Sequence, residues 1–130
     1  MPFRLDHIAV PVRDMAASVA FYTRVLGLAE VENPMGRGPI RWFALTTGVN
    51  LHLVPGNTAP LPMSEIGRHI ALATPDFDAM VARLEAAKVE FGEMPGRPGR
   101  VTKRPDGVRQ CFVRDPDNVW IEINDAPPRA

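Results

Sequence analysis

The chain repeats itself at an offset of 62 positions, and this internal repeat limits what it can fold into. The run His7-Ile8-Ala9-Val10 aligns with His69-Ile70-Ala71-Leu72, and at the same offset Asp14 aligns with Asp76. A duplication of this length predicts two modules that share one order of strands and helices. The whole chain has 130 residues, which suits one domain built from two such halves.

Each copy begins as a strand, a turn and a helix. Asp14 and Asp76 stand where an N-cap accepts the first free amide protons of a helix, and Gly27 is suited to close the first helix. Apolar residues follow at helical spacing in both copies: Met15, Val19, Tyr22 and Leu26 in the first, and Phe77, Met80, Val81 and Leu84 in the second.

Three more strands are expected after each helix, at residues 29–31, 40–46 and 50–54 in the first copy and 89–93, 108–113 and 119–123 in the second. Turns are expected at residues 47–49 and at Asp115-Pro116-Asp117-Asn118, where both aspartates would serve the turn. The sequence therefore predicts an α+β fold of two βαβββ modules, residues 3–56 and 66–125, with a linker at 55–67. Residues 93–107 read as a mobile loop, either solvated surface or a substrate lid.

The three histidines of the chain each interrupt an apolar strand, and Glu122 does the same near the C-terminus. Side chains alternate between the two faces of a strand, so these residues point away from their apolar neighbours. His7 and His69 occupy equivalent positions in the two copies, as do His52 and Glu122. We therefore expect two equivalent pairs of polar side chains to share the face opposite the helices.

Three imidazoles and one carboxylate that converge on one point form a site for a borderline divalent ion. A single strand histidine is more often solvent-facing or hydrogen-bonded than a ligand. That explanation fits poorly when all of these residues fall on repeat-related positions. The predicted ligands are His7, His69, Glu122 and His52, which would leave coordination positions open for water or substrate.

Three segments resemble the glyoxalase/bleomycin-resistance/dioxygenase superfamily, also called the vicinal oxygen chelate superfamily. They are residues 7–28, residues 67–76 and the ending 112–123, which reads FVRDPDNVWIEI. The resemblance covers nearly the whole chain. It implies two βαβββ modules that form a cup-shaped mixed sheet around one divalent metal ion, which is Zn, Ni, Fe, Mn or Co. The family's ligands carry over onto His7, His52, His69 and Glu122.

The resemblance implies a metal-dependent enzyme but leaves the reaction open. A glyoxalase-type lyase or isomerase, which stabilises an enolate-like intermediate, is the first expectation, with Glu122 as the catalytic base. Glyoxalase I usually has Glu at both strand-four positions, where this chain has His52 in one. An extradiol-type ring-cleaving dioxygenase is the alternative, because His7, His69 and Glu122 supply its ligand set. A fosfomycin-resistance transferase would have a hydroxyl residue where this chain has Ala9. The second alternative is a non-catalytic drug-binding protein, although such members typically lack the ligands.

Three residues are candidates for substrate binding. Trp120 shares the strand parity of Glu122, so it either stacks on a flat substrate or packs in a core or interface. Arg104 and Arg109 suit the bidentate binding of a carboxylate or phosphate, although surface charge explains at least one of them equally well. Residues 41–43 lie in a middle strand, and the side chains of either the odd or the even positions there face the cup.

The charge balance and the cysteine content restrict the binding partners and the cellular compartment that we expect. Lys plus Arg and Asp plus Glu both number 15, so the chain has no net field for nucleic acid or anionic lipid. No apolar run is long enough to span a membrane, and the first residues lack the apolar core of an export signal. With Cys111 as the one cysteine, we expect a cytoplasmic protein. We also expect a homodimer that acts on a small molecule, with its metal site either within one chain or shared between subunits.

Overall fold

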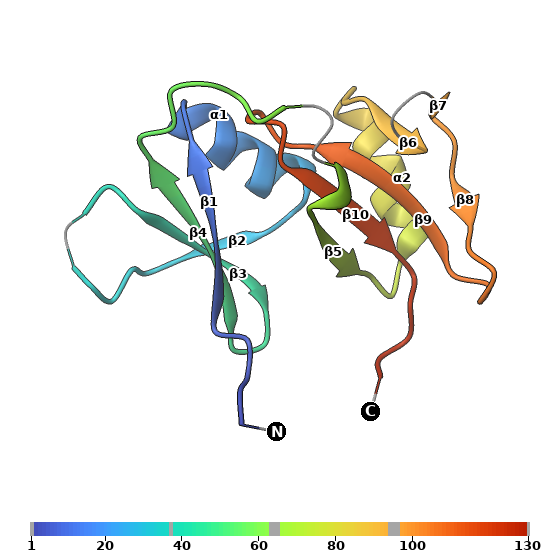
Figure 1. Cartoon of the computed structure of the whole chain (residues 1–130), viewed down its shortest axis with the longest axis horizontal. Coiled ribbons are helices and arrows are strands. Elements are labelled where there is room, and N and C mark those ends of the chain that lie inside the picture. The colour runs from blue at the N-terminus through green and yellow to red at the C-terminus, as the bar shows by residue number, and fades with distance from the viewer. Residues whose placement is uncertain (1, 37, 63–65, 94–96, 130) are drawn as a thin grey trace. The chain divides into compact units, whose positions relative to one another are not determined.

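The computed structural model describes residues 2–36, 38–62, 66–93 and 97–129, and it divides the chain into two compact units. Unit 1 runs from Met1 to Pro60 and unit 2 from Leu61 to Ala130. The division falls inside the stretch that the sequence predicts as a linker. Figure 1 shows that each unit contains its own sheet and its own helix.

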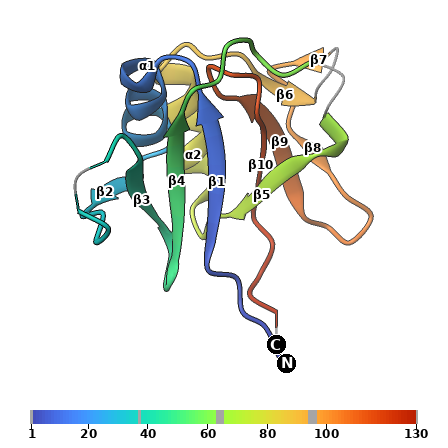
Figure 2. The same ribbon diagram turned by 60° about the vertical axis from the view of Figure 1, so that its left-hand side comes forward.

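Unit 1 is built on a four-stranded sheet in the order β1-β4-β3-β2. Its elements are β1 (His7–Val12), α1 (Met15–Ala20), η1 (Phe21–Val25), β2 (Ala29–Val31), β3 (Arg41–Thr46) and β4 (Val49–Pro55). β1 pairs with β4 in parallel, whereas β4 with β3 and β3 with β2 are antiparallel. The sheet is therefore mixed, and its strand order can be followed in Figure 2.

Unit 2 has a six-stranded sheet in the order β5-β10-β9-β6-β7, with β8 also paired to β9. Its elements are β5 (His69–Ala73), α2 (Phe77–Ala86), β6 (Phe91–Glu93), β7 (Arg97–Pro98), β8 (Thr102–Lys103), β9 (Arg109–Arg114) and β10 (Trp120–Asn124). β5 and β10 are parallel, as β1 and β4 are in unit 1.

The strand registers of the two units repeat each other. Ala9 pairs with His52 in unit 1, and Ala71 pairs with Glu122 in unit 2. Because the strands in each pair are parallel and in equivalent register, the equivalence deduced from the sequence holds at the level of hydrogen-bonded strands. The α+β fold class is confirmed, with one mixed sheet in each unit.

Both helices begin as the sequence predicts, but the first one ends differently. The carboxylate of Asp14 accepts a hydrogen bond from the amide of Ala17 at 3.1 Å, and Asp76 caps α2 in the same way. After Ala20 the α-helix widens into a π-helical turn, whereas regular α-helical spacing was predicted. The hydroxyl of Thr23 donates to the carbonyl of Val19 at 2.7 Å, so it competes for the acceptor that the Thr23 amide would use in an α-helix.

The described part of the predicted loop 93–107 contains strand residues that the sequence did not predict. β7 pairs with β6, and β8 pairs with β9, so parts of this stretch belong to the sheet. Residues 94–96 of the predicted loop lie outside the described residues. The turn after β9 behaves as expected, because Asp115 Oδ1 accepts from the amides of Asp117 and Val119, both at 2.8 Å.

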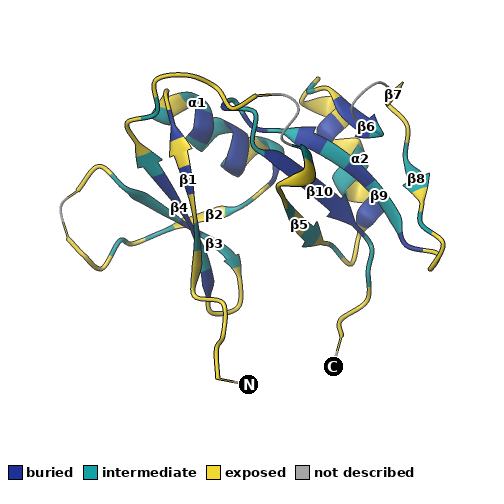
Figure 3. Ribbon diagram, viewed as in Figure 1, coloured by how far each residue is buried: buried dark blue, intermediate teal, exposed yellow. Residues whose placement is uncertain are grey.

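Alternate apolar residues of the strands, with residues of the helices, form most of the core, and Figure 3 marks the buried positions along the ribbon. In unit 1 they include Val10, Val12, Leu51 and Leu53, and in unit 2 they include Val113, Ile121, Ile123 and Leu84 of α2. The alternation that buries these residues turns the predicted ligands toward the other face. Among the residues described, no helix combines the length and apolar character needed to cross a membrane.

Candidate functional site

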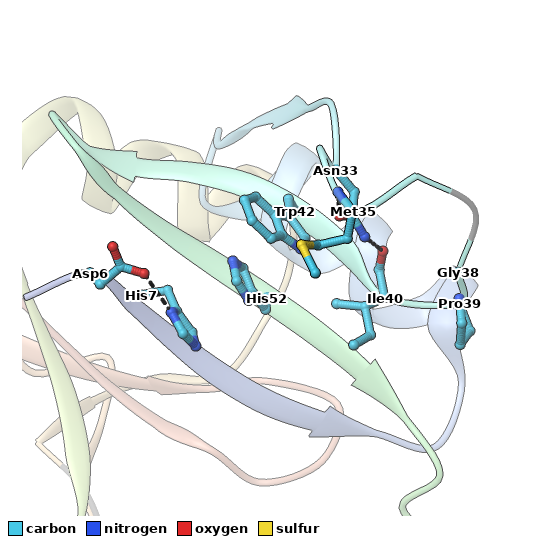
Figure 4. A pocket seen from close by; sticks show the side chains of 9 residues that line it. All are labelled: Asp6, His7, Asn33, Met35, Gly38, Pro39, Ile40, Trp42 and His52. Carbon is cyan, nitrogen blue, oxygen red and sulfur yellow. Dashed lines mark hydrogen bonds and ion pairs between the residues drawn. The ribbon is translucent and has the colours of Figure 1, made fainter.

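Unit 1 brings two of the predicted ligands together, on neighbouring strands. The rings of His7 and His52 are stacked, with centroids 4.2 Å apart and planes 11° from parallel. Trp42 of β3 pairs with His52 in register and stacks on its other side at 3.9 Å. Figure 4 shows the three rings in a row across β1, β4 and β3.

The imidazole of His7 is oriented by Asp6. Its Nδ1 lies 2.9 Å from Asp6 Oδ2, so this nitrogen carries the proton that is donated to the carboxylate. The hydrogen bond from His7 holds the pKa of the Asp6 carboxyl below its usual range, with Arg4 contributing at 3.3 Å. The second ring nitrogen, Nε2, keeps its lone pair for another partner. A carboxylate behind a histidine is the usual support of a metal ligand.

His52 is a buried neutral base. Burial lowers the pKa of its imidazole, and the neighbouring His7 lowers it further, so the ring is uncharged near pH 7. Its Nε2 atom is buried and has no hydrogen-bond partner among the described residues. A buried polar atom without a partner is costly unless something binds it. This orphaned nitrogen fits a site that is completed by another group.

Unit 2 brings together the other two predicted ligands. His69 Nε2 lies 3.5 Å from Glu122 Oε1. The Nδ1 atom of His69 lies 2.9 Å from the carbonyl oxygen of Ile66 and must donate to it, so in the neutral ring Nε2 has a lone pair. Two donors about 2.1 Å from a tetrahedral ion lie roughly 3.4 Å apart. The spacing of the His69–Glu122 pair therefore fits two neighbouring ligands of one divalent ion.

The carboxylate of Glu122 is held firmly in a buried environment. The side-chain amide of Asn124 donates a short hydrogen bond to Oε2, and the Asn124 oxygen accepts from the amide of Ala126 at 3.1 Å. A guanidinium nitrogen of Arg104 lies 3.9 Å from the same Oε2. Arg104 also makes a two-pronged contact with Asp106, at 2.6 and 3.2 Å. Of the predicted substrate-binding residues, Arg104 lies beside the carboxylate.

The predicted ligands thus form two pairs, one in each unit. Within the described part of the chain, no group of three His, Cys, Asp or Glu side chains is arranged to hold a metal ion. The pairs differ in geometry. Lone pairs of imidazoles lie in the ring plane, so stacked, nearly parallel rings do not aim at one point. An ion about 2.1 Å from both Nε2 atoms of His7 and His52 would lie well outside both ring planes.

The other two candidate substrate contacts lie away from the Glu122 carboxylate oxygens or inside the core. Trp120 shares the face of Glu122, but only 1% of it is exposed, and it packs edge-on against Phe112. Its ring is part of the core, which is the alternative that the sequence left open for it. Arg109 lies on the opposite face, because it follows the parity of the buried Cys111 and Val113. There its guanidinium binds Asp125 and Asp78, both at 2.8 Å, and covers the ring of Phe77.

Three supporting residues were missed from the sequence. Asp6 precedes His7, Asn124 follows Glu122 by two positions, and Trp42 pairs with His52. For the first two, a polar residue beside a predicted ligand was an available signal. Trp42 was considered only as one residue of a middle strand whose orientation was open, and the register now turns it toward the histidines.

The chain is similar to several known proteins. The model of the Glyoxalase/Bleomycin resistance protein/Dioxygenase superfamily matches residues 4–123. The protein YwbC of Bacillus subtilis (strain 168) is 30% identical over 128 residues, covering 95% of this chain and 98% of YwbC. Among solved structures, Oxidase ChaP-H2 aligns with a TM-score of 0.79 and 28% identity over 98% of this chain and 96% of that one. A glyoxalase/dioxygenase from Nostoc punctiforme aligns with a TM-score of 0.74 and 28% identity over 96% and 92%.

Proposed function

Because this chain belongs to the Glyoxalase/Bleomycin resistance protein/Dioxygenase superfamily, we propose that it is an enzyme that transforms a small molecule with one divalent metal ion. The observation that carries the proposal is the His69–Glu122 pair. With a neutral His69, two lone-pair donors lie 3.5 Å apart in a partly buried position, where a cation between them would remove their repulsion. His7, whose Nε2 is also left free by its Asp6 hydrogen bond, is the third ligand that we propose.

The ligand set favours an oxygen-dependent reaction over the lyase that the sequence ranked first. Two histidines and one carboxylate, with the remaining positions open, are typical of non-haem iron(II) oxygenases. The stack with His7 and Trp42 argues against His52 as a fourth ligand. The similarity to an oxidase and to a glyoxalase/dioxygenase supports the same choice. When bound, iron(II) would supply a Lewis acid for substrate oxygens and electrons for dioxygen.

We propose a distinct role for each residue around the site. Asp6 and the carbonyl of Ile66 orient the two histidines, and Asn124 orients Glu122. We propose that Arg104, whose guanidinium lies 3.9 Å from Glu122 Oε2, binds the substrate, because a guanidinium can hold an oxyanion. His52, neutral and with an unpartnered nitrogen, is available to accept a proton or hydrogen bond.

A glyoxalase-type lyase or isomerase is the second candidate. Its support is the equivalence of His52 and Glu122, which occupy the same register position in the two units. In that reaction His52 would turn out of its stack to become the fourth ligand, and Glu122 would act as the base. The two candidates therefore differ in whether His52 binds the metal.

Metal analysis of protein purified without an affinity tag tests the site. We expect about one equivalent of divalent metal in the parent and a large loss in His69→Ala and Glu122→Ala, while the surface variant Glu85→Gln stays unchanged. Retention of metal in both site variants would contradict the proposal. With metal present, His52→Asn separates the candidates, since only the lyase geometry requires this residue for full metal content.

The reaction class is tested on the iron-loaded protein. We expect dioxygen consumption with simple catechols as probes, and none after chelation. Conversion of a methylglyoxal–glutathione adduct, without any use of dioxygen, would favour the second candidate. We also propose a homodimer, which sedimentation of the metal-loaded protein tests directly.

A further inference from the structure

Unit 1 contains a pocket of about 450 Å³ directly beside His7 and His52 (Figure 4). This volume lies in the range of small-molecule sites. We propose that the pocket binds a flat, uncharged aromatic ring system of the substrate, and that Trp42 and Met35 select for it. The inference rests on the proposed function, in which His7 is a metal ligand. It adds which part of the substrate lies next to His7.

The shape of the proposed site comes from its aromatic wall. His7, His52 and Trp42 stack in one direction on three neighbouring strands, with interplanar angles of 11° and 17°. Stacking fixes the orientation of the rings, so the wall is rigid before a ligand arrives. Ile40 and Pro39 add apolar surface at its end. A rigid wall of aromatic and aliphatic groups suits a flat ring, which stacks or packs edge-on with little loss of freedom.

The polar groups of the lining are already used within the protein. Asn33 donates to the carbonyl of Ile40 at 3.0 Å and accepts from the amide of Met35 at 2.9 Å. Asp6 accepts from His7 and contacts Arg4. Part of the hydrogen-bonding capacity of Asn33 and Asp6 is therefore used within the protein before a ligand arrives.

The charge of the lining points in the same direction. No Lys or Arg is among the described residues that line the pocket, and Asp6 is the one carboxylate. In the metal-free protein, a carboxylate or phosphate in the pocket would face the Asp6 carboxylate with no cation among the described lining residues, because Arg4, 3.3 Å from Asp6, lies outside the lining. The pocket therefore disfavours anionic groups, including the two carboxylates of a glutathione conjugate.

Met35 forms the outer lip of the pocket. It is 81% exposed although it is large and apolar, and the two hydrogen bonds of Asn33 hold the turn that carries it. Figure 4 shows its side chain reaching toward the indole of Trp42. A thioether is flexible and polarisable and makes favourable contacts with aromatic rings. Met35 can therefore cover a ring that lies against the wall.

The test uses 2-naphthol as a neutral probe and 2-naphthoate as its anionic counterpart, with the full chain in metal-free and metal-loaded form. Calorimetry measures affinity, and the two tryptophan indole N–H signals in NMR report the location. We expect 2-naphthol to bind both forms and to shift the Trp42 signal, while the signal of the buried Trp120 stays in place. In the metal-free form we expect 2-naphthoate to bind at least about tenfold more weakly than 2-naphthol.

Met35→Glu adds a charge at an exposed position, so the variant should fold normally and bind 2-naphthol roughly tenfold more weakly. Phe3→Ala, at an apolar position that is 88% exposed and outside the pocket, should bind as the parent does. Equal affinity of the metal-free form for both probes, a shift of Trp120 alone, or no effect of Met35→Glu would overturn the inference. Binding by the metal-free form separates this result from the metal proposal, which can fail or hold independently.

Discussion

At the scale of single residues, the candidate site depends on the hydrogen bond that each histidine makes with its other ring nitrogen. Asp6 receives the Nδ1 proton of His7, and the carbonyl of Ile66 receives that of His69. Both bonds fix the tautomer that leaves Nε2 as a lone-pair donor. The two histidines are thus prepared for a cation by different means, one by a carboxylate and one by the backbone.

This difference predicts an effect of Asp6→Asn on metal affinity. The amide oxygen of Asn can still accept the proton of His7 Nδ1, but without a negative charge it makes the imidazole a weaker donor. We expect metal affinity to fall by roughly tenfold, the lower end for supporting residues, because Asp6 is exposed to solvent. Calorimetric titration with Zn²⁺ measures this, with Glu85→Gln as a matched control. Unchanged affinity in Asp6→Asn would mean that His7 does not bind the ion.

Cys111 predicts a pH dependence of stability. Burial raises the pKa of its thiol to about 11, and the negative charge of Glu122 adds to the effect. The unfolded chain loses the thiol proton near pH 9, whereas the folded chain keeps it, so stability falls as pH rises between these values. Between pH 8 and pH 10 we expect a loss of about 1 kcal/mol from this group. Guanidinium unfolding at both pH values should show a smaller loss in Cys111→Ala.

The sequence allowed the ligand pairs to be predicted, but not their final geometry. Strand alternation and the repeat were sufficient to predict that His7 with His52 and His69 with Glu122 share a face. Alternation says which face a side chain takes and nothing of its ring rotation. The stacking of His52 between two rings was therefore not foreseeable. For Arg109 the face itself was open, because its parity toward α2 follows only once the bounds of β9 are known.

At the scale of elements, local signals predicted the starts of helices and most strands, and they failed where tertiary pairing decides the outcome. Asp14 and Asp76 cap their helices as predicted, since capping depends on residues three positions apart. The short strands β7 and β8 were missed. They have two residues each, and they exist because β6 and β9 offer free edges to pair with.

The pairing of β6 with β7 requires a residue without a Cβ atom at position 92. The φ of Gly92 is +148°, and a Cβ atom there would lie 2.6 Å from both Arg97 O and Gly99 N. These are backbone atoms that cannot rotate away, so Gly92→Ala should destabilise the fold by about 2–4 kcal/mol through strain and lost pairing. Gly67→Ala, which has no atom within 4 Å of its Cβ position, should change stability little. Urea unfolding of both variants gives the comparison, and equal midpoints would contradict the structure of this edge.

At the scale of the whole molecule, each of the two units carries one ligand pair and one of the two tryptophans. His7 and His52 belong to unit 1 with Trp42, while His69 and Glu122 belong to unit 2 with Trp120. A metal ion that binds His7 together with His69 and Glu122 would couple the stabilities of the two units. A ligand that binds only the folded state stabilises it by about 2.7 kcal/mol when its concentration is a hundred times Kd.

This coupling can be measured on protein labelled with 5-fluorotryptophan, which gives one ¹⁹F NMR signal for each unit. The variant Trp42→Phe lacks one signal and so assigns both. We expect Zn²⁺ to raise the urea midpoints of both signals together and a chelator to reverse both shifts. In Glu122→Ala the ion should stabilise neither unit strongly, because a single imidazole pair binds weakly and the stacked rings of His7 and His52 do not converge. A shift confined to the Trp120 signal would mean that unit 2 holds the ion alone. His7 would then lose its proposed role as a ligand, while the His69–Glu122 pair would keep its own.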